Sequence, residues 1–299
     1  MAPCACIDIG SNTTRLLVAE SRAGGLKEVA AERRFVRLRA GGGVPVPPER
    51  IDALADAVAA QVALARRHGA RRLRVVATAA IRTAPNRQAL VAAVERAAGV
   101  PLVVLSSEEE ARLAFAGATA GLGEAPPGSV GVADVGGGSS ELVVGTIAGG
   151  VSWCASLPVG SGLLADRHLR SDPPSAAQLE SVRADVARAL EGLEPPRPDA
   201  AYAVGGSATS LRRLVGDELS IPSLDRALAD LAGVPAATAA ERFGLHAERV
   251  RLLPAGLLLL RGAVEAFGGV PLRITRGGLR EGVVLRELAR QAVAELDHG

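Results

Sequence analysis

Two stretches of this chain repeat one pattern, and the repeat constrains the fold more than any other feature. Asp8–Val18 (DIGSNTTRLLV) aligns without a gap with Asp134–Val144 (DVGGGSSELVV), acid on acid and glycine on glycine. In each copy an apolar run ends in an acid, a turn of small polar residues follows, and a second apolar run begins. This order is typical of a β-hairpin, so the sequence predicts the same strand–turn–strand element in two halves of the chain.

Strand-like and helix-like segments alternate around both copies. In the first half we expect strands at 4–9, 14–20, 72–82 and 100–105, and helices at 49–68, 85–98 and 106–120. The segment 32–44 is expected to be a third strand that runs into a glycine-rich loop. In the second half we expect strands at 130–135, 141–147, 151–157, 200–204 and 271–275. We expect a helix near 161–169, a long helix that follows the prolines of 171–180 and ends near 193, and a helix from 207 to 214. Further helices are expected across 225–267 and at 278–296. The Gly/Pro-rich segment 121–129 separates the halves. We therefore expect an α/β fold with domains 1–121 and 122–299, and ligands at the strand ends in a cleft between the halves.

The composition argues against several classes of function. The chain has 299 residues, of which 48 % are hydrophobic, so each half can bury a core. A net charge of +2 is too balanced for bulk binding to nucleic acid, and 2 % aromatic residues are too few to stack on single strands. No nucleic-acid partner is expected.

Targeting and redox signals are also weak. The apolar run 252–260 contains a proline and falls far short of a membrane span, so no membrane partner is expected. The first ten residues lack the features of a signal peptide. The three cysteines lack metal-ligand spacing, and Cys4 and Cys6 are interpreted as small buried hydrophobic residues. A reduced, cytoplasmic protein is the simplest interpretation.

The glycine-rich turn of the second copy is suited to binding phosphate. The turn contains three consecutive glycines, Gly136, Gly137 and Gly138, which permit positive φ and let backbone N–H groups converge into an anion-binding nest. Ser139 adds a hydroxyl to this nest. The acid before them, Asp134, fits a Mg²⁺ ion shared with phosphate oxygens. The same argument applies to Asp8 with Ser11, Asn12 and Thr13. Such turns are also ordinary hairpin chemistry, and it is their duplication that favours phosphate binding.

Two further places are candidates for binding phosphate, and each also has a purely structural interpretation. Gly206 and Ser207 begin a helix, whose N-terminus attracts anions; Ser207 could equally serve as a helix cap. Arg82, at the end of its expected strand, could hold a phosphate in a forked geometry or simply lie at the surface.

A basic stripe and an acidic run leave similar alternatives open. Alternation along a strand would place Arg33, Arg37 and Arg39 on one face, suited to a polyanion or to solvent. The acidic run 108–110 begins a helix, where Ser107 and Glu110 match a capping box. From the pattern alone, no catalytic glutamate can be chosen among the three.

Taken together, these stretches resemble the exopolyphosphatase / guanosine pentaphosphate phosphohydrolase (Ppx/GppA) family. The resemblance covers almost the whole chain, in order: DIGSNTTRLLVAE, VRLRAGGGV, VVATAAIRTAPN, VVLSSEEEARLAF, ADVGGGSSELVVG, SLPVGSG with SDPP, AVGGSATSL and GGLREGVV. It implies the actin/Hsp70/sugar-kinase superfamily fold, with two ribonuclease-H-like domains and an interdomain cleft. It also implies that the closing helix, about 280–297, packs back on the first domain.

The resemblance also implies roles for individual residues. Glu110, directly before Ala-Arg, matches the catalytic glutamate, and Asp134 and Glu141 match the metal-binding and water-positioning acids. Asp8 matches the acid of the first turn. The phosphate-contacting positions are matched by Ser11, Asn12, Thr13, Arg82 and the loop Gly136, Gly137, Gly138 and Ser139.

Two departures from the family pattern stand out. Long members carry a C-terminal extension with an HD-type motif beyond the last residue of this sequence, so we expect a preference for shorter polyphosphate chains. The usual Ser-Asp-x before GLREG is Thr275-Arg276-Gly277 here. Arg276 either changes the charge of the cleft or adds a phosphate contact.

The expected activity is Mg²⁺-assisted hydrolysis of the terminal phosphoanhydride of inorganic polyphosphate. Glu110, helped by Glu141, would orient and deprotonate the attacking water. A pppGpp 5′-phosphohydrolase would use the same chemistry. The remaining alternatives are an ATP-binding kinase of the same superfamily and a non-catalytic polyphosphate-binding protein. Because homodimers are common in the resembled family, a homodimer is also possible here.

Overall fold

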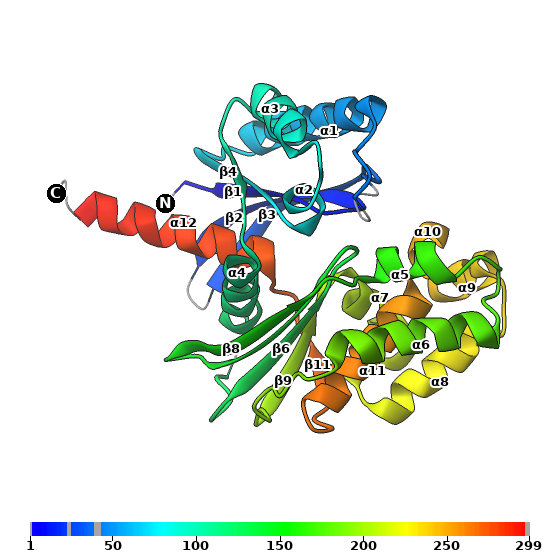
Figure 1. The fold of residues 1–299 in the computed structure, drawn as a ribbon. Helices are drawn as coiled ribbons and strands as arrows, with labels where there is room; N and C mark the ends of the chain where they lie inside the picture. Colours follow the sequence, from blue (N-terminus) through cyan, green and yellow to red (C-terminus); the bar gives the residue numbers. More distant parts are fainter. Residues whose placement is uncertain (1, 23–24, 39–42, 123, 297–299) are drawn as a thin grey trace. The chain divides into compact units, whose positions relative to one another are not determined.

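The chain folds into two compact α/β units. The computed structural model describes all residues except 1, 23–24, 39–42, 123 and 297–299. One unit combines Met1–Gly123 with Gly277–Gly299, and the other is Glu124–Arg276. Each unit is built on a single sheet (Figure 1). The predicted division into domains 1–121 and 122–299 stays a prediction.

The sheet of the first unit has five strands in the order β3-β2-β1-β4-β5. These are β1 (Cys4–Ile9), β2 (Thr13–Arg22), β3 (Gly25–Phe35), β4 (Arg72–Ala77) and β5 (Leu102–Val104). The first three strands are antiparallel neighbours, whereas β4 pairs parallel with both β1 and β5. The carboxyl end of β1, where Asp8 lies, is therefore flanked by the turn into β2 and by the end of β4.

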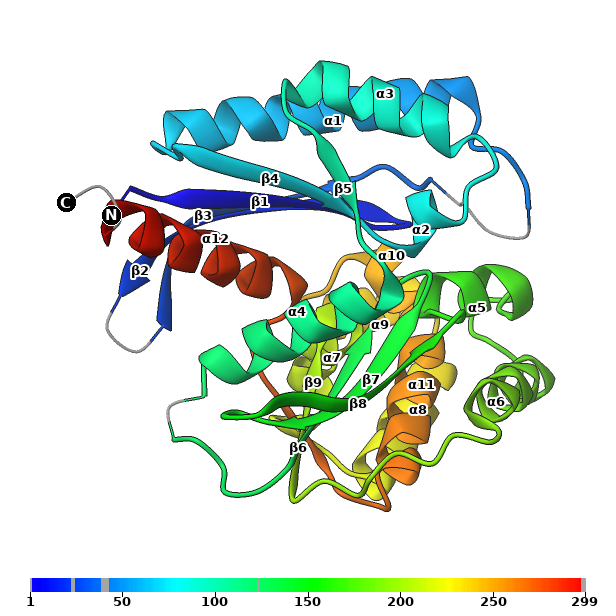
Figure 2. The same ribbon diagram turned by 60° about the vertical axis from the view of Figure 1, so that its left-hand side comes forward.

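Helices cover both faces of this first sheet. They are α1 (Pro48–Arg67), α2 (Ala79–Arg82), α3 (Arg87–Ala98), α4 (Ser107–Ala120) and α12 (Leu279–Leu296). Figure 2 shows α1 and α3 together on one face and α12 along the other, where it packs on β1, β2 and α4. Side chains alternate along β1, so Ile7 and Ile9 join the α1 core while Cys4 and Cys6 join the α12 core. Burial raises the pKa of both thiols, which agrees with their interpretation as buried hydrophobic residues.

The second unit repeats this topology. Its strands are β6 (Val130–Val135), β7 (Ser140–Thr146), β8 (Gly150–Leu157), β9 (Ala200–Val204), β10 (Glu218–Leu219) and β11 (Leu272–Ile274). The order β8-β7-β6-β9-β11 matches the first sheet strand for strand, with β10 added antiparallel at the edge. Both units therefore have the predicted ribonuclease-H-like topology.

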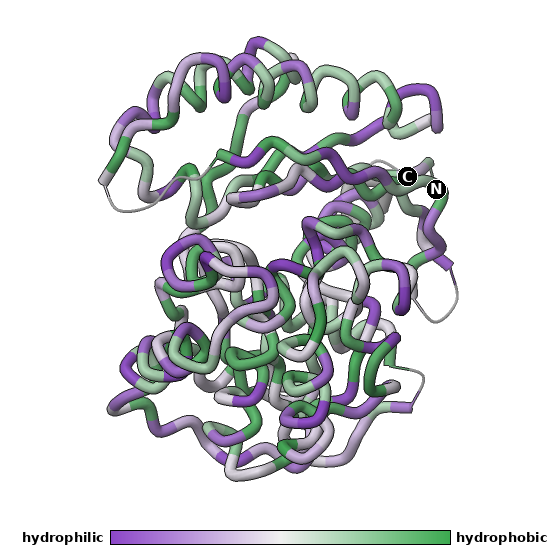
Figure 3. Tube along the Cα trace, turned by 90° about the vertical axis from the view of Figure 1, so that its right-hand side faces the viewer, coloured by the Kyte–Doolittle hydropathy of each residue, from purple (hydrophilic) through white to green (hydrophobic). Residues whose placement is uncertain are grey.

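The helices of the second unit gather on one face of its sheet (Figure 1). They are α5 (Ser161–His168), α6 (Ala176–Leu190), α7 (Gly205–Val215), α8 (Ile221–Ala232), α9 (Ala236–Phe243), α10 (Ala247–Val250) and α11 (Leu253–Ala266). The apolar run 252–260 lies almost wholly within α11, which packs against α5, α6, α7 and α8 and is buried, as predicted. Along the outer helices, polar and apolar residues alternate (Figure 3). Among the described residues, no helix is long and apolar enough to cross a membrane.

The duplicated hairpins match in strand register as well as in sequence. Asp8 lies opposite Arg15 in the β1–β2 pair, and Asp134 lies opposite Glu141 in the β6–β7 pair. Each second strand also has an irregularity at the equivalent place, after Val18 and after Val144. The repeat seen in the sequence is therefore a repeat of backbone structure.

Several predicted element boundaries are wrong. The strand expected to begin at 32 and run into a glycine-rich loop begins at Gly25 and ends at Phe35, before Arg37, which adopts a left-handed φ of 47°. The strand expected at 72–82 ends at Ala77, and the short helix α2 follows, so Arg82 lies at a helix end. The helix expected from Pro85 begins at Arg87, after Asn86, whose side chain bonds to the backbone of Val46.

Candidate active site

Both duplicated turns are closed by the same hydrogen bond. In the first unit Gly10 N donates to Thr13 O at 3.0 Å, and in the second Gly136 N donates to Ser139 O at 3.0 Å. Each turn follows the carboxyl end of the central strand of its sheet, where ligands bind in open α/β folds.

The first turn is held by the segment that follows β3. Val36 N and Arg37 N donate to Asn12 O, and Leu38 N donates to Ser11 O at 2.9 Å. In a trans peptide the N–H points opposite to the preceding C=O. The N–H groups of Asn12 and Thr13 therefore point away from segment 36–38.

The predicted basic stripe is not a strand face in this structure. Arg33 is exposed on β3, whereas Arg37 lies beyond the end of that strand beside Asn12. Arg39 lies outside the described residues. The alternation argument is wrong, because β3 ends at Phe35. Polyanion binding by these arginines stays a prediction.

The second turn is held by the first turn of α5. Ser161 donates to Gly136 O from its backbone N at 2.9 Å and its Oγ at 3.1 Å, and Leu163 N donates to Gly137 O at 2.9 Å. The N–H groups of Gly137 and Gly138 therefore point away from α5. A Cβ on Gly160 would lie 2.5–2.6 Å from backbone atoms of the loop, so only glycine fits there. Ser140 Oγ donates to Val159 O at 2.8 Å and fixes the other side of the turn.

Asp8 presents a carboxylate that lacks a full set of hydrogen bonds. Its Oδ1 is buried and has no hydrogen-bond partner among the described residues. Burial raises the pKa of Asp8, while the nearby Arg15 and Arg280 oppose this shift by favouring the charged form. The side chain as a whole is only half-buried. A carboxylate oxygen in such a place fits a cation as its partner.

Asp134 and Glu141 lie directly opposite each other on β6 and β7. Glu141 is 2 % exposed, and Ser156 Oγ on β8 donates to its Oε1 at 3.0 Å. Carboxylates at opposite positions repel each other, and a bound cation would offset that repulsion. Among the described residues, no group of three or more Asp, Glu, His or Cys side chains is arranged so that it could hold a metal ion. A Mg²⁺ ion held by one or two carboxylates and by phosphate oxygens does not need one, so the residues present fit the predicted ion.

The N-terminus of α7 lies beside Asp134. Gly205 has a φ of 91°, and a Cβ there would lie 2.8 Å from Asp134 Oδ1. A Cβ on Gly206 would lie 2.8 Å from Nη1 of Arg249, so this guanidinium packs over the start of the helix. The capping alternative for Ser207 is wrong, because α7 has no side-chain cap. Ser207 is buried with its Oγ against Gly256 of α11.

The three glutamates at the start of α4 have different environments. The capping box joins Ser106 to Glu109, with Glu109 N donating to Ser106 Oγ at 3.1 Å. The predicted box of Ser107 with Glu110 is wrong by one residue, because the extended backbone of Ser106 starts the helix at Ser107. Glu108 is exposed and pairs with Arg112. Glu110 is therefore not needed for capping.

Glu110 instead forms an ion pair with Arg82 of α2. Arg82 Nη1 donates to Glu110 Oε2 at 3.0 Å and to Leu105 O at 2.9 Å. Glu110 is 6 % exposed, and such a charge is stable only when it is paired. Both contacts of Arg82 use Nη1, so the three N–H donors on Nε and Nη2 take no part in them.

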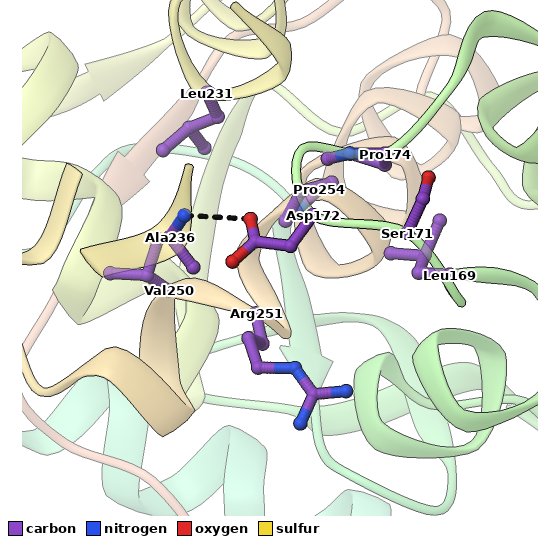
Figure 4. A pocket seen from close by; sticks show the side chains of 9 residues that line it. All are labelled: Leu169, Ser171, Asp172, Pro174, Leu231, Ala236, Val250, Arg251 and Pro254. Atoms are coloured by element: carbon purple, nitrogen blue, oxygen red, sulfur yellow. Dashed lines mark hydrogen bonds between the residues drawn. The ribbon is translucent and has the colours of Figure 1, made fainter. Parts of the chain in front are cut away.

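A pocket in the second unit is separate from these residues. It is lined by Leu169, Ser171, Asp172, Pro174, Leu231, Ala236, Val250, Arg251 and Pro254 (Figure 4). Asp172 Oδ1 accepts from Ala236 N at 2.7 Å, so it caps the N-terminus of α9. None of the predicted site residues lines this pocket, and we assign it a structural role.

Several residues at the site were not identified as candidates from the sequence. Ser161 and Gly160 hold the second turn, Ser156 bonds Glu141, and Arg249 lies over Gly206. Glycine and serine next to a glycine-rich turn are a weak local signal. Nothing near Gly206 in the sequence points to Arg249, because the fold alone brings the two together.

The duplicated topology and the paired acid turns define a member of the actin/Hsp70/sugar-kinase superfamily, built from two ribonuclease-H-like domains. Comparison with known proteins gives the family: residues 17–291 match the Ppx/GppA phosphatase family, and the chain belongs to it.

Relatives and solved structures support this assignment along the chain. Exopolyphosphatase 1 of Mycobacterium tuberculosis is 30% identical, and the match covers 96% of this chain and 88% of that protein. Guanosine-5′-triphosphate,3′-diphosphate pyrophosphatase of Aeromonas hydrophila is 28% identical over 94% of this chain but only 58% of its own length. The crystal structure of the Aquifex aeolicus Ppx/GppA family member has a TM-score of 0.80, with 26% identity over 97% of this chain and 98% of that one.

Proposed function

We propose that this protein is an exopolyphosphatase that releases orthophosphate from the end of inorganic polyphosphate. One observation carries the proposal: each unit joins an acid to a turn whose N–H groups point away from the segment that holds it, Asp8 in one unit and Asp134 in the other. Family membership and the named exopolyphosphatase relatives support the same reaction. Phosphoryl transfer needs mainly positioning and charge neutralisation, which such turns supply.

Each unit would contribute its own contacts to phosphate. The N–H groups of Asn12, Thr13, Gly137 and Gly138 would bind phosphate oxygens. Arg82 would bridge a phosphate and Glu110, because its contacts with Glu110 and Leu105 leave Nε and Nη2 to donate.

Glu110 would act as the general base toward the attacking water. Its ion pair with Arg82 at 3.0 Å holds this carboxylate in place. Glu141 is the proposed water-positioning acid of the second unit, and Asp8 and Asp134 are the proposed metal-binding acids of their own units. When bound, Mg²⁺ would neutralise charge on the transferred phosphoryl group.

A pppGpp 5′-phosphohydrolase is the second candidate, and the relative from Aeromonas hydrophila favours it. The exopolyphosphatase is preferred because its named relative is matched over a larger share of its own length. A cytoplasmic location and a homodimer stay predictions, and size-exclusion chromatography would test the latter.

A substrate panel tests the proposal directly. Short and long polyphosphate, pppGpp and ATP are offered to the purified protein with Mg²⁺, and released orthophosphate is measured before and after EDTA. We expect rapid release from polyphosphate that EDTA abolishes. Release from pppGpp alone would select the second candidate, and no release from any substrate would refute both.

A further inference from the structure

Ser156 on β8 occupies a special place in the sheet of the second unit. The register aligns three residues across adjacent strands: Asp134 on β6, Glu141 on β7 and Ser156 on β8. Directly opposite residues put their side chains on the same face of a sheet. The hydroxyl of Ser156 is therefore placed beside Glu141 by the backbone itself.

We propose that Ser156 is a positioning residue that fixes the carboxylate of Glu141 for the hydrolysis of polyphosphate. The inference rests on the proposed function. Ser156 Oγ donates to Glu141 Oε1 at 3.0 Å, and Glu141 is nearly completely buried. A hydrogen bond to one oxygen of a buried carboxylate restricts its rotation, and so it sets the direction in which the other oxygen points.

The environment of Glu141 explains why such a donor is useful. Asp134 lies directly opposite, and the repulsion between two carboxylates favours turning Glu141 away from it. A neutral hydroxyl can hold the carboxylate in place without cancelling its charge. A cationic donor would compete with the metal ion for that charge, whereas serine does not.

The first unit has different residues at the equivalent positions, and no glutamate lies at the position of Glu141. The residues in the equivalent register are Asp8, Arg15 and Arg33. There, arginine replaces the glutamate and a second arginine replaces the serine. The hydroxyl thus occurs in the unit where the middle residue is a carboxylate.

The chain offers a matched control on the same strand. Ser152 Oγ, also on β8, donates across to β7, but its acceptor is the backbone oxygen of Val144 at 3.1 Å. Ser152→Ala removes one hydroxyl and one cross-strand hydrogen bond, as Ser156→Ala does, but it leaves Glu141 untouched.

The test compares kcat and KM for polyphosphate in the wild type and five variants, among them Glu141→Gln alone and combined with Ser156→Ala. We expect Ser156→Ala to lower kcat about 10- to 100-fold, as the loss of an outer hydrogen bond to a functional ligand typically does, with KM within about 2-fold. Ser156→Thr keeps the hydroxyl, and β-branched residues suit strands, so it should recover most of the rate. Ser152→Ala should match the wild type. Because Ser156 acts through Glu141, Ser156→Ala added to Glu141→Gln should cause no further loss.

The outcomes separate this inference from the proposed function. A wild-type protein that releases no phosphate refutes the function itself. An active wild type overturns the inference alone in any of three cases: Ser156→Ala keeps full kcat, Ser156→Thr is as impaired as Ser156→Ala, or the losses of Ser156→Ala and Glu141→Gln multiply. Unchanged melting temperatures across the serine variants show that kcat, rather than folding, is being compared.

Discussion

The two units place different side chains on nearly the same backbone. Both have the same strand order, the same closing hydrogen bond in the turn and the same irregularity in the second strand. The side chains in register across the three antiparallel strands differ, however. In the first unit they are an acid and two arginines, Asp8, Arg15 and Arg33. In the second unit they are two acids and a serine, Asp134, Glu141 and Ser156. The first row suits a polyanion, and the second suits a cation and water.

This difference shows how a duplicated fold can carry different side chains on equivalent backbone positions. The backbone of each turn supplies N–H groups whatever the side chains are. The side chains in register beside the turn then decide which partner each copy attracts. The following predictions test that division of roles, from the largest expected effect to the smallest.

The largest effect is expected at Glu110, which has its own place on α4 outside both rows. Glu110→Gln removes the general base but preserves shape, and we expect kcat for polyphosphate to fall about 1000-fold, within the range found for general bases. Glu109→Gln is the matched control from the same helical turn, since Glu109 serves the capping box. Phosphate release measured at saturating Mg²⁺ checks both. Full activity of Glu110→Gln would remove Glu110 from the mechanism.

The next effect concerns the two acids that begin the rows. Asp134→Asn should raise the Mg²⁺ concentration for half-maximal activity at least about 10-fold, because it removes one of two neighbouring carboxylates. Asp8→Asn should raise it less, since Arg15 and Arg280 already lie near that carboxylate. Titration of activity with Mg²⁺ measures both. Equal shifts, or a larger one for Asp8→Asn, would contradict the different roles of the two rows.

A smaller effect separates the glycines at equivalent places in the two turns. A Cβ on Gly136 would lie 2.9 Å from Ser139 O, whereas a Cβ on Gly10 would lie 3.4 Å from Thr13 O. Gly136→Ala must shift the backbone and should cost about 1–3 kcal/mol of stability, and Gly10→Ala much less. Thermal melting followed by circular dichroism compares them. If both variants melt alike, the two turns differ less in packing than the structure indicates.

The repeat and its turns could be predicted from sequence because they depend on local signals. An acid, a glycine-rich turn and two flanking apolar runs predict a hairpin wherever they occur, and both hairpins were found. The predicted basic stripe was wrong because a single left-handed residue, Arg37, ends the local pattern. Nothing in the alternation of side chains signals such a change of φ.

The contacts that complete the site depend on register and tertiary packing. The sequence is compatible with a capping box of Ser106 with Glu109 or of Ser107 with Glu110, and the structure has the first. This one-residue difference leaves Glu110 without a capping role. The ion pair of Glu110 with Arg82 depends on how α2 meets α4. The bond from Ser156 to Glu141 depends on the strand register of β7 and β8. Only the folded chain determines these.

The smallest effect concerns how the second turn is supported from behind. The N-terminus of α5 holds Gly136 and Gly137, and its C-terminus is fastened to α6 through Asp185, which contacts three basic side chains: His168, Arg167 and Arg188. Bonds from His168, then Arg167, lower the pKa of Asp185 to about 2. In the part of the chain that the structure describes, the first turn is held by segment 36–38 and not by the start of a helix.

Asp185→Asn should therefore destabilise the protein by only about 1 kcal/mol at pH 7, because solvent screens a cluster with exposed arginines. A depressed carboxylate pKa gives stability that is fully present above the unfolded value of 3.8 and is lost as pH falls toward about 2. The difference between wild type and variant in urea unfolding should thus be constant from pH 7 to 5 and shrink between pH 4 and 3. A difference that stayed constant down to pH 3 would show that Asp185 holds α5 by packing rather than by charge. The contacts that hold α5 behind the second turn would then depend on pH as little as the backbone hydrogen bonds that hold the first turn.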